Sequence, residues 1–380
     1  MSASLSPPAA LIALRSCGGR VAFSSAPDLT WDTSYWDTQM VNLARFALIG
    51  CFVFMGACNR SPDSSGEALL APGPGERAEE RQSEPPAAPR PRVALVMKTR
   101  ANPFFVAMES GARRAEVEHG VELVVRTHGD ETAVQEQIAI VEKLIDEDID
   151  AIVLVPGNSS ELVPVVKRAQ DAGVAIVNVD NRIDPAAAAA WKLAPIPFVG
   201  VDNTRGAKAV AEYLVSRLER PAEVAIIAGD PAAQSSVARE RGAREVFASH
   251  DDVELVAHEA ANWKIKLAHE VAGRLIDQHP KLAGIFCAND VMALGVIRQL
   301  EERGRSDILV AGYDNLDAAR GAIKRGAMLA TVDQNAGEQG YLGVTYAARV
   351  LADEPVPPET MVDVALVTAA SLEHQAQRSR

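Results

Sequence analysis

From residue 93 onward, short runs of β-branched and other apolar residues alternate with stretches of helical period. The runs are VALVM at 93–97, ELVVR at 122–126, AIVLV at 151–155 and AIVNV at 175–179, followed by EVAIIA at 223–228, ELVAH at 254–258, AGIFC at 283–287, ILVAG at 308–312 and MLATV at 328–332. We interpret these runs as strands buried on both faces. Their alternation with helices predicts an α/β fold of two doubly wound parallel sheets with right-handed crossovers.

The segments between the runs have the period of amphipathic helices. Val134, Ile138, Val141 and Ile145 recur at offsets of four and three, which gives one apolar stripe on an otherwise polar helix. Such helices cover the faces of a parallel sheet.

Polar side chains follow several of the predicted strands. Lys98 and Asn102 follow the first, Asp180 and Asn181 the fourth, and Asn289, Asp290 and Asp314 follow strands of the second half. Open α/β sheets bind ligands beyond the carboxyl ends of their strands. Each residue alone is equally typical of a helix N-cap or a turn. Their joint occurrence in both halves favours a ligand site.

The N-terminal part contains the layout of an export signal. Arg45 precedes the uncharged run FALIGCFVFMGAC at 46–58, which is too short to span a bilayer. A buried core helix is the alternative. The run ends in Met55-Gly56-Ala57-Cys58, which resembles the lipobox of bacterial lipoproteins. That resemblance implies a signal peptide at 40–57 and lipidation of Cys58, which would anchor the protein to a membrane.

The segments before and after this signal peptide are interpreted separately from it. Met40 is an ordinary signal start, so we interpret residues 1–39 as a doubtful extension, the alternative being a genuine extension of unknown use. Residues 58–91 are dense in Pro, Gly, Ser and Glu and cannot bury enough apolar surface to fold. We expect them to form a disordered tether between the anchor and the folded body.

Charge and cysteine usage exclude several classes of protein. Lys plus Arg total 38 against 51 for Asp plus Glu, a net charge of −13, which disfavours nucleic-acid binding. The four cysteines show no CxxC spacing, so no zinc site or redox pair is predicted. Only Cys58 and Cys287 remain after signal cleavage, without a disulfide. We predict no metal and no cofactor.

Residues 92–370 resemble the ribose-binding-protein branch of periplasmic sugar-binding proteins, the solute receptors of ABC importers. The resemblance rests on RVALVMKTRANPFF at 92–105, IVNVDN at 176–181, SSVARERGAREVF at 235–247, ANWKIK at 261–266, FCANDVMALG at 286–295, AGYDN at 311–315 and ATVDQ at 330–334. It implies the type I fold, with three hinge crossings near Asp202, Asn335 and Pro357. The lobes would be 92–201 plus 335–357, and 202–334 plus 358–372.

The resemblance also implies a sugar site. Phe104 and Phe105 would stack on one face of the ring while Trp263 covers the other. Hydrogen bonds to hydroxyls are implied for Asn102, Asp180, Arg239, Asn289, Asp314 and Gln334. Aromatic rings suit the apolar faces of a sugar, and charged or amide groups suit its rim of hydroxyls. Core packing is the alternative for the aromatic residues.

Two positions depart from the ribose-binding pattern. Lys98 stands where a small polar residue is usual, and Asn181 where Arg is usual. With Lys98 and Arg239 opposite Asp180 and Asp314, the site would be formally neutral, as suits an uncharged sugar or polyol. Arg182 could partly replace the missing guanidinium. The exchange of these two residues argues against ribose itself and leaves open a hexose, another pentose, a sugar alcohol or a signalling furanose.

These observations predict a monomeric, lipid-anchored receptor on the periplasmic side of a bacterial membrane that delivers a sugar or polyol to an ABC permease and ATPase. A receptor that docks onto a chemoreceptor or sensor kinase is the alternative. The effector domain of a LacI-type repressor is a second alternative. It would require a helix-turn-helix segment before residue 92, and the predicted tether occupies that place instead. No catalytic motif is present, and Asp180 and Asp314 fit hydrogen bonding better than glycosidase chemistry.

Overall fold

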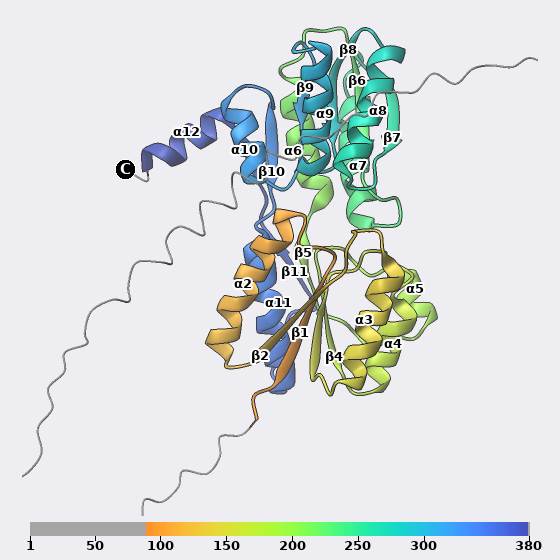
Figure 1. Ribbon diagram of the computed structural model, residues 1–380, viewed down its shortest axis with the longest axis vertical. Coiled ribbons are helices and arrows are strands. Elements are labelled where there is room, and N and C mark those ends of the chain that lie inside the picture. The colour runs from red at the N-terminus through yellow and green to blue at the C-terminus, as the bar shows by residue number, and fades with distance from the viewer. Residues whose placement is uncertain (1–88, 379–380) are drawn as a thin grey trace, which may run out of the picture. The chain divides into compact units, whose positions relative to one another are not determined.

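The computed structural model describes residues 89–378. The predicted extension at 1–39, the signal peptide at 40–57, the lipidated Cys58 and the tether as far as residue 88 lie outside them. The described part forms two six-stranded sheets with helices on their faces (Figure 1). This confirms the predicted α/β class of two parallel-sheet lobes.

The first sheet is parallel throughout and has the order β11-β5-β4-β3-β1-β2. Its strands are β1 (Arg92–Met97), β2 (Glu122–Thr127), β3 (Ala151–Leu154), β4 (Ala175–Val179), β5 (Phe198–Val201) and β11 (Glu359–Val362). The side chains of β1 alternate between two cores, with Leu95 and Met97 in one and Ala94 and Val96 in the other. Because both faces of the strand are buried, helices must cover the sheet on both sides.

The helices of the first lobe are α2 (Pro103–His119), α3 (Val134–Asp146), α4 (Val163–Asp171), α5 (Pro185–Ala190) and α11 (Ala336–Leu351). Helices α2 and α11 lie side by side (Figure 1), and their backbones approach closely because Gly111 and Gly340 carry no side chain. A Cβ atom at either glycine would overlap the backbone of the neighbouring helix. Helices α3 and α4 pack on the opposite face, where Val141 and Leu144 are buried.

The second sheet has the order β12-β10-β9-β8-β6-β7. Its strands are β6 (Ala222–Ala228), β7 (Val253–Ala260), β8 (Leu282–Cys287), β9 (Leu309–Ala311), β10 (Ala330–Asp333) and β12 (Ala365–Thr368). All pairings are parallel except that of β12 with β10. An antiparallel edge strand is common on an otherwise parallel sheet.

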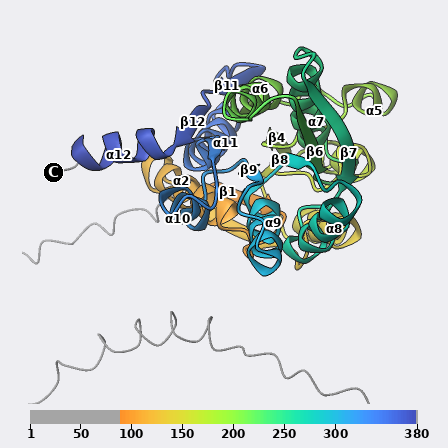
Figure 2. The same cartoon turned by 90° about the horizontal axis from the view of Figure 1, so that it is seen from above.

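The helices of the second lobe are α6 (Asn203–Val215), α7 (Gln234–Ala248), α8 (Ile265–Gln278), α9 (Asp290–Arg303), α10 (Asp317–Lys324) and α12 (Ala369–Arg378). Helices α6 and α7 pack together on one side of the strands, and α8 and α9 on the other (Figure 2). Every helix within residues 89–378 is too short or too polar to cross a lipid bilayer.

Two predicted strands are less buried than expected. ELVVR and ELVAH were predicted to be covered on both faces, but β2 and β7 are edge strands with exposed or half-buried residues along most of their length. The prediction was wrong because composition does not show which strand lies at an edge. Strands β5, β11 and β12 were not predicted, because Gly200 interrupts the apolar run of β5 and because β11 and the first half of β12 are exposed or half-buried.

The chain changes sheet three times. It passes from β5 to α6 at Asp202, and from β10 to α11 at Asn335. The third change lies after Val362, not near Pro357 as predicted, because β11 still pairs with β5 from Glu359 to Val362. Residues 359–362 therefore belong to the first sheet, and the assignment of all of 358–372 to the second lobe was wrong.

Candidate functional site

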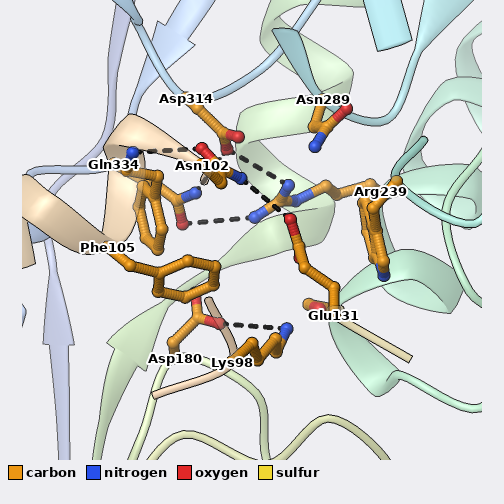
Figure 3. Close-up of a pocket in the computed structure, with 12 residues that line it drawn as sticks. Lys98, Asn102, Phe105, Glu131, Asp180, Arg239, Asn289, Asp314 and Gln334 are labelled. Carbon is orange, nitrogen blue, oxygen red and sulfur yellow. Dashed lines mark hydrogen bonds and ion pairs between the residues drawn. The ribbon is translucent and has the colours of Figure 1, made fainter. Parts of the chain in front are cut away.

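A pocket lies at the carboxyl ends of both sheets, and both lobes contribute to its lining (Figure 3). The lining residues are Lys98, Asn102, Phe104, Phe105, Glu131, Asp180, Ser235, Arg239, Trp263, Asn289, Asp314 and Gln334. All predicted site residues within residues 89–378 are among them except Asn181. Glu131 and Ser235 were not predicted.

Two asparagines that line the pocket are also helix N-caps. Asn102 caps α2, since its Oδ1 accepts a hydrogen bond from the Phe104 amide at 3.0 Å. Asn289 caps α9 in the same way, accepting from the Met292 amide at 2.9 Å. The cap occupies the side-chain oxygen, so the amide nitrogen is the donor left to meet a ligand, although one N–H of Asn102 already donates to Glu131. For these two residues the N-cap and ligand-site interpretations are compatible.

Arg239 on α7 is the centre of a buried hydrogen-bond network. Its Nε donates to Asn203 Oδ1 at 2.7 Å, and its Nη1 donates to the Ala288 carbonyl at 2.9 Å. The guanidinium also contacts Asp314 Oδ1 at 3.4 Å and Gln334 Oε1 at 3.2 Å. Gln334 donates in turn to Asp314 at 2.7 Å. The network fixes the guanidinium plane and leaves Asp314 Oδ2 available to a ligand.

The first lobe supplies a second buried ion pair. Lys98 Nζ lies 3.7 Å from Asp180 Oδ2, and both side chains are almost fully buried. The ammonium also lies 5.7 Å from the centre of the Phe105 ring and 5.8 Å from that of Trp263. Asp180 has a φ of +63°, a backbone conformation that L-residues rarely adopt. Strain of this kind is concentrated at ligand sites.

The aromatic residues are held in defined positions. Phe104 and Phe105 meet edge to face, with ring centres 5.1 Å apart, and both rings are buried at the pocket. Trp263 reaches the pocket from the other lobe, after β7. Its φ is +64°, and that of the preceding Asn262 is +49°. A rigid turn thus holds the indole against the pocket.

Glu131 changes the predicted charge of the site. It lies on the loop after β2, and its Oε1 accepts a hydrogen bond from Asn102 Nδ2 at 3.1 Å. Lys98 and Arg239 therefore face Glu131, Asp180 and Asp314, so the prediction of a formally neutral site was wrong. The strand-end rule that pointed to Asp180 applies equally to the second strand and would have found Glu131.

Burial controls the protonation of two of these carboxyl groups. It raises the pKa of Glu131, an effect that Asp180 increases and that Lys98, Asn102 and Arg239 oppose. Burial also raises the pKa of Asp314 well above its usual value, in spite of the Arg239 guanidinium, and the nearby carboxylates add to the rise. Because three carboxyl groups share two cations, the site favours retention of a proton.

Comparisons with known proteins agree with this geometry. The family model described as "Periplasmic binding protein domain" matches residues 93–355. The chain belongs to the periplasmic binding proteins. It is 40% identical over 286 residues to the D-ribose/D-allose-binding protein of Pseudomonas aeruginosa, which covers 74% of this chain and 88% of the relative. The predicted family resemblance is confirmed.

Further relatives support both the family and its type I fold. The D-allose-binding periplasmic protein of Escherichia coli is 32% identical over 283 residues, covering 72% of this chain and 91% of the relative. A crystal structure of an ABC transporter periplasmic solute binding protein from Actinobacillus succinogenes, with bound D-allose, superposes with a TM-score of 0.71 at 31% identity. That match covers 75% of this chain and 100% of the other.

Asn181 lies outside the pocket of this binding protein. Its side chain is buried, accepts a hydrogen bond from the Ser235 amide at 3.1 Å and donates to the Pro156 carbonyl at 2.9 Å. Asn181 thus links the first lobe to α7 of the second, and its predicted place in the ligand site was wrong. Arg182 does not line the pocket either, because it stacks 3.9 Å from the Phe198 ring centre and pairs with Glu359 at 2.9 Å.

Further contacts join the two lobes away from the chain crossings. Ser159 donates through its amide to the Ala232 carbonyl at 3.0 Å and accepts from the Gln234 amide at 3.0 Å. Asp130 pairs with Lys264 at 3.1 Å. Hydrogen bonds from Thr132 lower the pKa of Asp130 to about 2, so its carboxylate is ionised for this pair at neutral pH. The lobes therefore meet on both sides of the pocket.

Among residues 89–378, no group of three or more acidic, histidine or cysteine side chains is arranged to hold a metal ion. Cys287 is a buried free thiol at the end of β8, and burial raises its pKa. The thiol therefore stays protonated at neutral pH and packs as a small apolar group.

Gly229→Ala is expected to weaken ligand binding. A Cβ atom at Gly229 would overlap the Trp263 ring, so the indole would have to leave its place beside the pocket. We expect about a tenfold or larger loss of affinity, on the order of an aromatic contact, with the folded state retained. Calorimetric titration with the best ligand measures the loss. Gly321→Ala on α10, where the added methyl group would meet only the end of the Arg325 side chain, at 4.0 Å, is the matched control.

Proposed function

We propose that this protein captures a monosaccharide or polyol on the periplasmic side of a bacterial membrane and presents it to an ABC importer. Support comes from relatives whose names state D-ribose or D-allose binding, and from the related solute binding protein with bound D-allose. The importer's permease and ATPase would be the partners, as the description of that relative as part of an ABC transporter suggests.

The observation that carries the proposal is the chemistry of the pocket. Aromatic rings from both lobes border it, and charged or amide groups fill the space between them. A sugar ring has apolar C–H faces and an edge of hydroxyls, each of which donates and accepts hydrogen bonds. Asp180 and Asp314 provide acceptors, while Arg239 and Asn289 provide donors.

We further propose that the ligand favours closure of the two lobes. Asp180 and Lys98 come from the first lobe, and Asp314 and Arg239 from the second, so a ligand that bonds to both pairs gains contacts only in the closed state. A ligand shifts a conformational equilibrium through such differential contacts. We also propose that the protein acts as a monomer, tethered through a lipid on Cys58.

A sugar screen tests this function directly. We expect D-allose or D-ribose to raise the thermal unfolding temperature, since ligand at 100 times Kd stabilises the folded state by about 2.7 kcal/mol. Myo-inositol and D-arabinose extend the panel, and sucrose serves as a control that is too large for the pocket. If the folded protein shows no shift with any monosaccharide or polyol, the proposal fails.

A further inference from the structure

Helix α7 of the second lobe begins at a residue that cannot cap it. The N-cap is Ala233, whose methyl side chain accepts no hydrogen bond, although the first N–H groups of a helix need acceptors from outside it. Two acceptors come from the first lobe. Ser159 Oγ accepts from the Gln234 amide at 3.0 Å, and Asn181 Oδ1 accepts from the Ser235 amide at 3.1 Å. Side chains of one lobe therefore cap a helix of the other.

Two further hydrogen bonds join the same segments. The Ser159 amide donates to the Ala232 carbonyl at 3.0 Å, and Gln234 Nε2 donates to Asp184 Oδ2 at 2.9 Å. We call this set of four hydrogen bonds the interlobe cap. It consists of Ser159, Asn181 and Asp184 of the first lobe with residues 232–235 of the second.

The acceptors of the interlobe cap are fixed by contacts within the first lobe. Asn181 donates through Nδ2 to the Pro156 carbonyl at 2.9 Å, and its own carbonyl accepts from Asn178 Nδ2 at 2.9 Å. The Ser159 carbonyl accepts from the Asp184 amide at 2.8 Å. These contacts do not involve the second lobe, so the acceptors keep their places when the lobes separate. The interlobe cap can therefore form on closure with little additional ordering of the chain.

The interlobe cap lies beside the sugar pocket without being part of it. Ser159, Asn181 and Asp184 do not line the pocket. Helix α7, however, contributes Ser235 and Arg239 to the lining. The helix that the first lobe caps is thus the helix that carries ligand groups of the second lobe. The interlobe cap and a bound ligand favour the same arrangement of the lobes through separate contacts.

We propose that Ser159 and Asn181 are positioning residues that stabilise the closed arrangement independently of the ligand and thereby raise the affinity for every sugar by one factor. This inference rests on the proposed sugar binding and lobe closure. In the open arrangement water satisfies the amides of Gln234 and Ser235, so the interlobe cap contributes to the closed arrangement alone. A ligand that binds the closed arrangement then supplies less of the free energy of closure, and its apparent affinity rises accordingly.

Ser159→Ala tests the proposal. It leaves the Gln234 amide without its acceptor in the closed arrangement only. We expect the affinities for D-allose and D-ribose to fall by one common factor of about 3- to 30-fold, the loss typical of a missing N-cap acceptor. Calorimetric titration measures both affinities. Damage to the pocket would instead change the two sugars by different factors, because their contacts with the pocket differ.

Binding kinetics provide a second readout. Sugar enters the open arrangement, in which the interlobe cap is not formed, so the association rate should change less than about twofold. The release rate should rise by the factor by which affinity falls. Stopped-flow measurement of tryptophan fluorescence, to which Trp263 at the pocket contributes, gives both rates.

Ser160→Ala is the matched control, because it is the same substitution at the next residue. Ser160 is exposed, and only its backbone takes part in hydrogen bonds within residues 89–378. Its affinities and rates should equal those of the wild-type protein. Gln234→Ala removes the bond to Asp184 from the second-lobe side, and we expect the same common factor at about 2- to 5-fold. This variant decides the question if thermal unfolding without sugar shows that Ser159→Ala does not fold.

The outcomes separate this inference from the function on which it rests. Unchanged affinities in folded Ser159→Ala, different factors for the two sugars, or slower association with unchanged release would each overturn the role of the interlobe cap and leave the proposed function in place. If the wild-type protein binds only one of the two sugars, another monosaccharide or polyol of the screen replaces the other. If it binds none, the proposed function itself fails.

Discussion

Arg239→Ala should abolish sugar binding and destabilise the folded protein. Arg239 is 4% exposed and holds Asn203, Asp314 and Gln334 in one network. The central carbon of its planar guanidinium also lies 3.9 Å from the centre of the Tyr313 ring. Removal leaves the buried Asp314 carboxyl without a cation, and breaking a buried pair from one side costs about 3–5 kcal/mol.

The affinity for the best sugar should fall more than about 100-fold, because a charged donor disappears and Asp314 and Gln334 lose their positions. Calorimetry measures the affinity, and urea unfolding measures the stability. Arg239→Lys keeps the charge without the planar fork, and we expect it to fold better but still to bind weakly. Arg241→Ala is the control on the same helix, where the side chain is 61% exposed. Full affinity in folded Arg239→Ala would contradict the assigned role of Arg239.

The strands and most of the residues that line the pocket could be predicted because their signals are local. Buried parallel strands give apolar runs, and ligand groups follow the carboxyl ends of those runs, as Lys98, Asp180 and Asp314 do. The location of Glu131 was also available from this rule, but its loop carries two acidic residues, Asp130 and Glu131. Which of them turns inward is decided by Asn102, which lies 29 positions away in the chain.

Other features depend on partners that are distant in the sequence. Strands β11 and β12 lie close together in the sequence, and only the pairing of β11 with β5 and of β12 with β10 assigns them to different sheets. Asn181 follows Asp180, which lines the pocket, but its side chain turns to Ser235 of the second lobe. Of two adjacent residues, one can thus line the pocket while the other joins the lobes. The place of a residue in the family's sequence motif does not by itself distinguish these two positions.

Asp180→Ala is expected to lower the affinity for sugar about 100-fold or more. Asp180 lies at the side of the pocket nearer the crossings, where its carboxylate would be an acceptor from the first lobe for ring hydroxyls in the proposed function. Hydrogen bonds to a carboxylate are stronger than those to neutral groups, and a buried hydroxyl without its acceptor is costly. Titration with D-allose and D-ribose should show a large loss for both sugars.

The pair with Lys98 determines how this loss should be interpreted. Asp180→Ala leaves the buried ammonium without its carboxylate at 3.7 Å, so part of the lost affinity would come from an altered Lys98 and not from the missing acceptor. The double variant Asp180→Ala with Lys98→Met removes that contribution. If the carboxylate itself binds the sugar, the double variant remains at least about 100-fold weaker than Lys98→Met alone. Recovery to the affinity of Lys98→Met would instead show that Asp180 acts only by positioning Lys98.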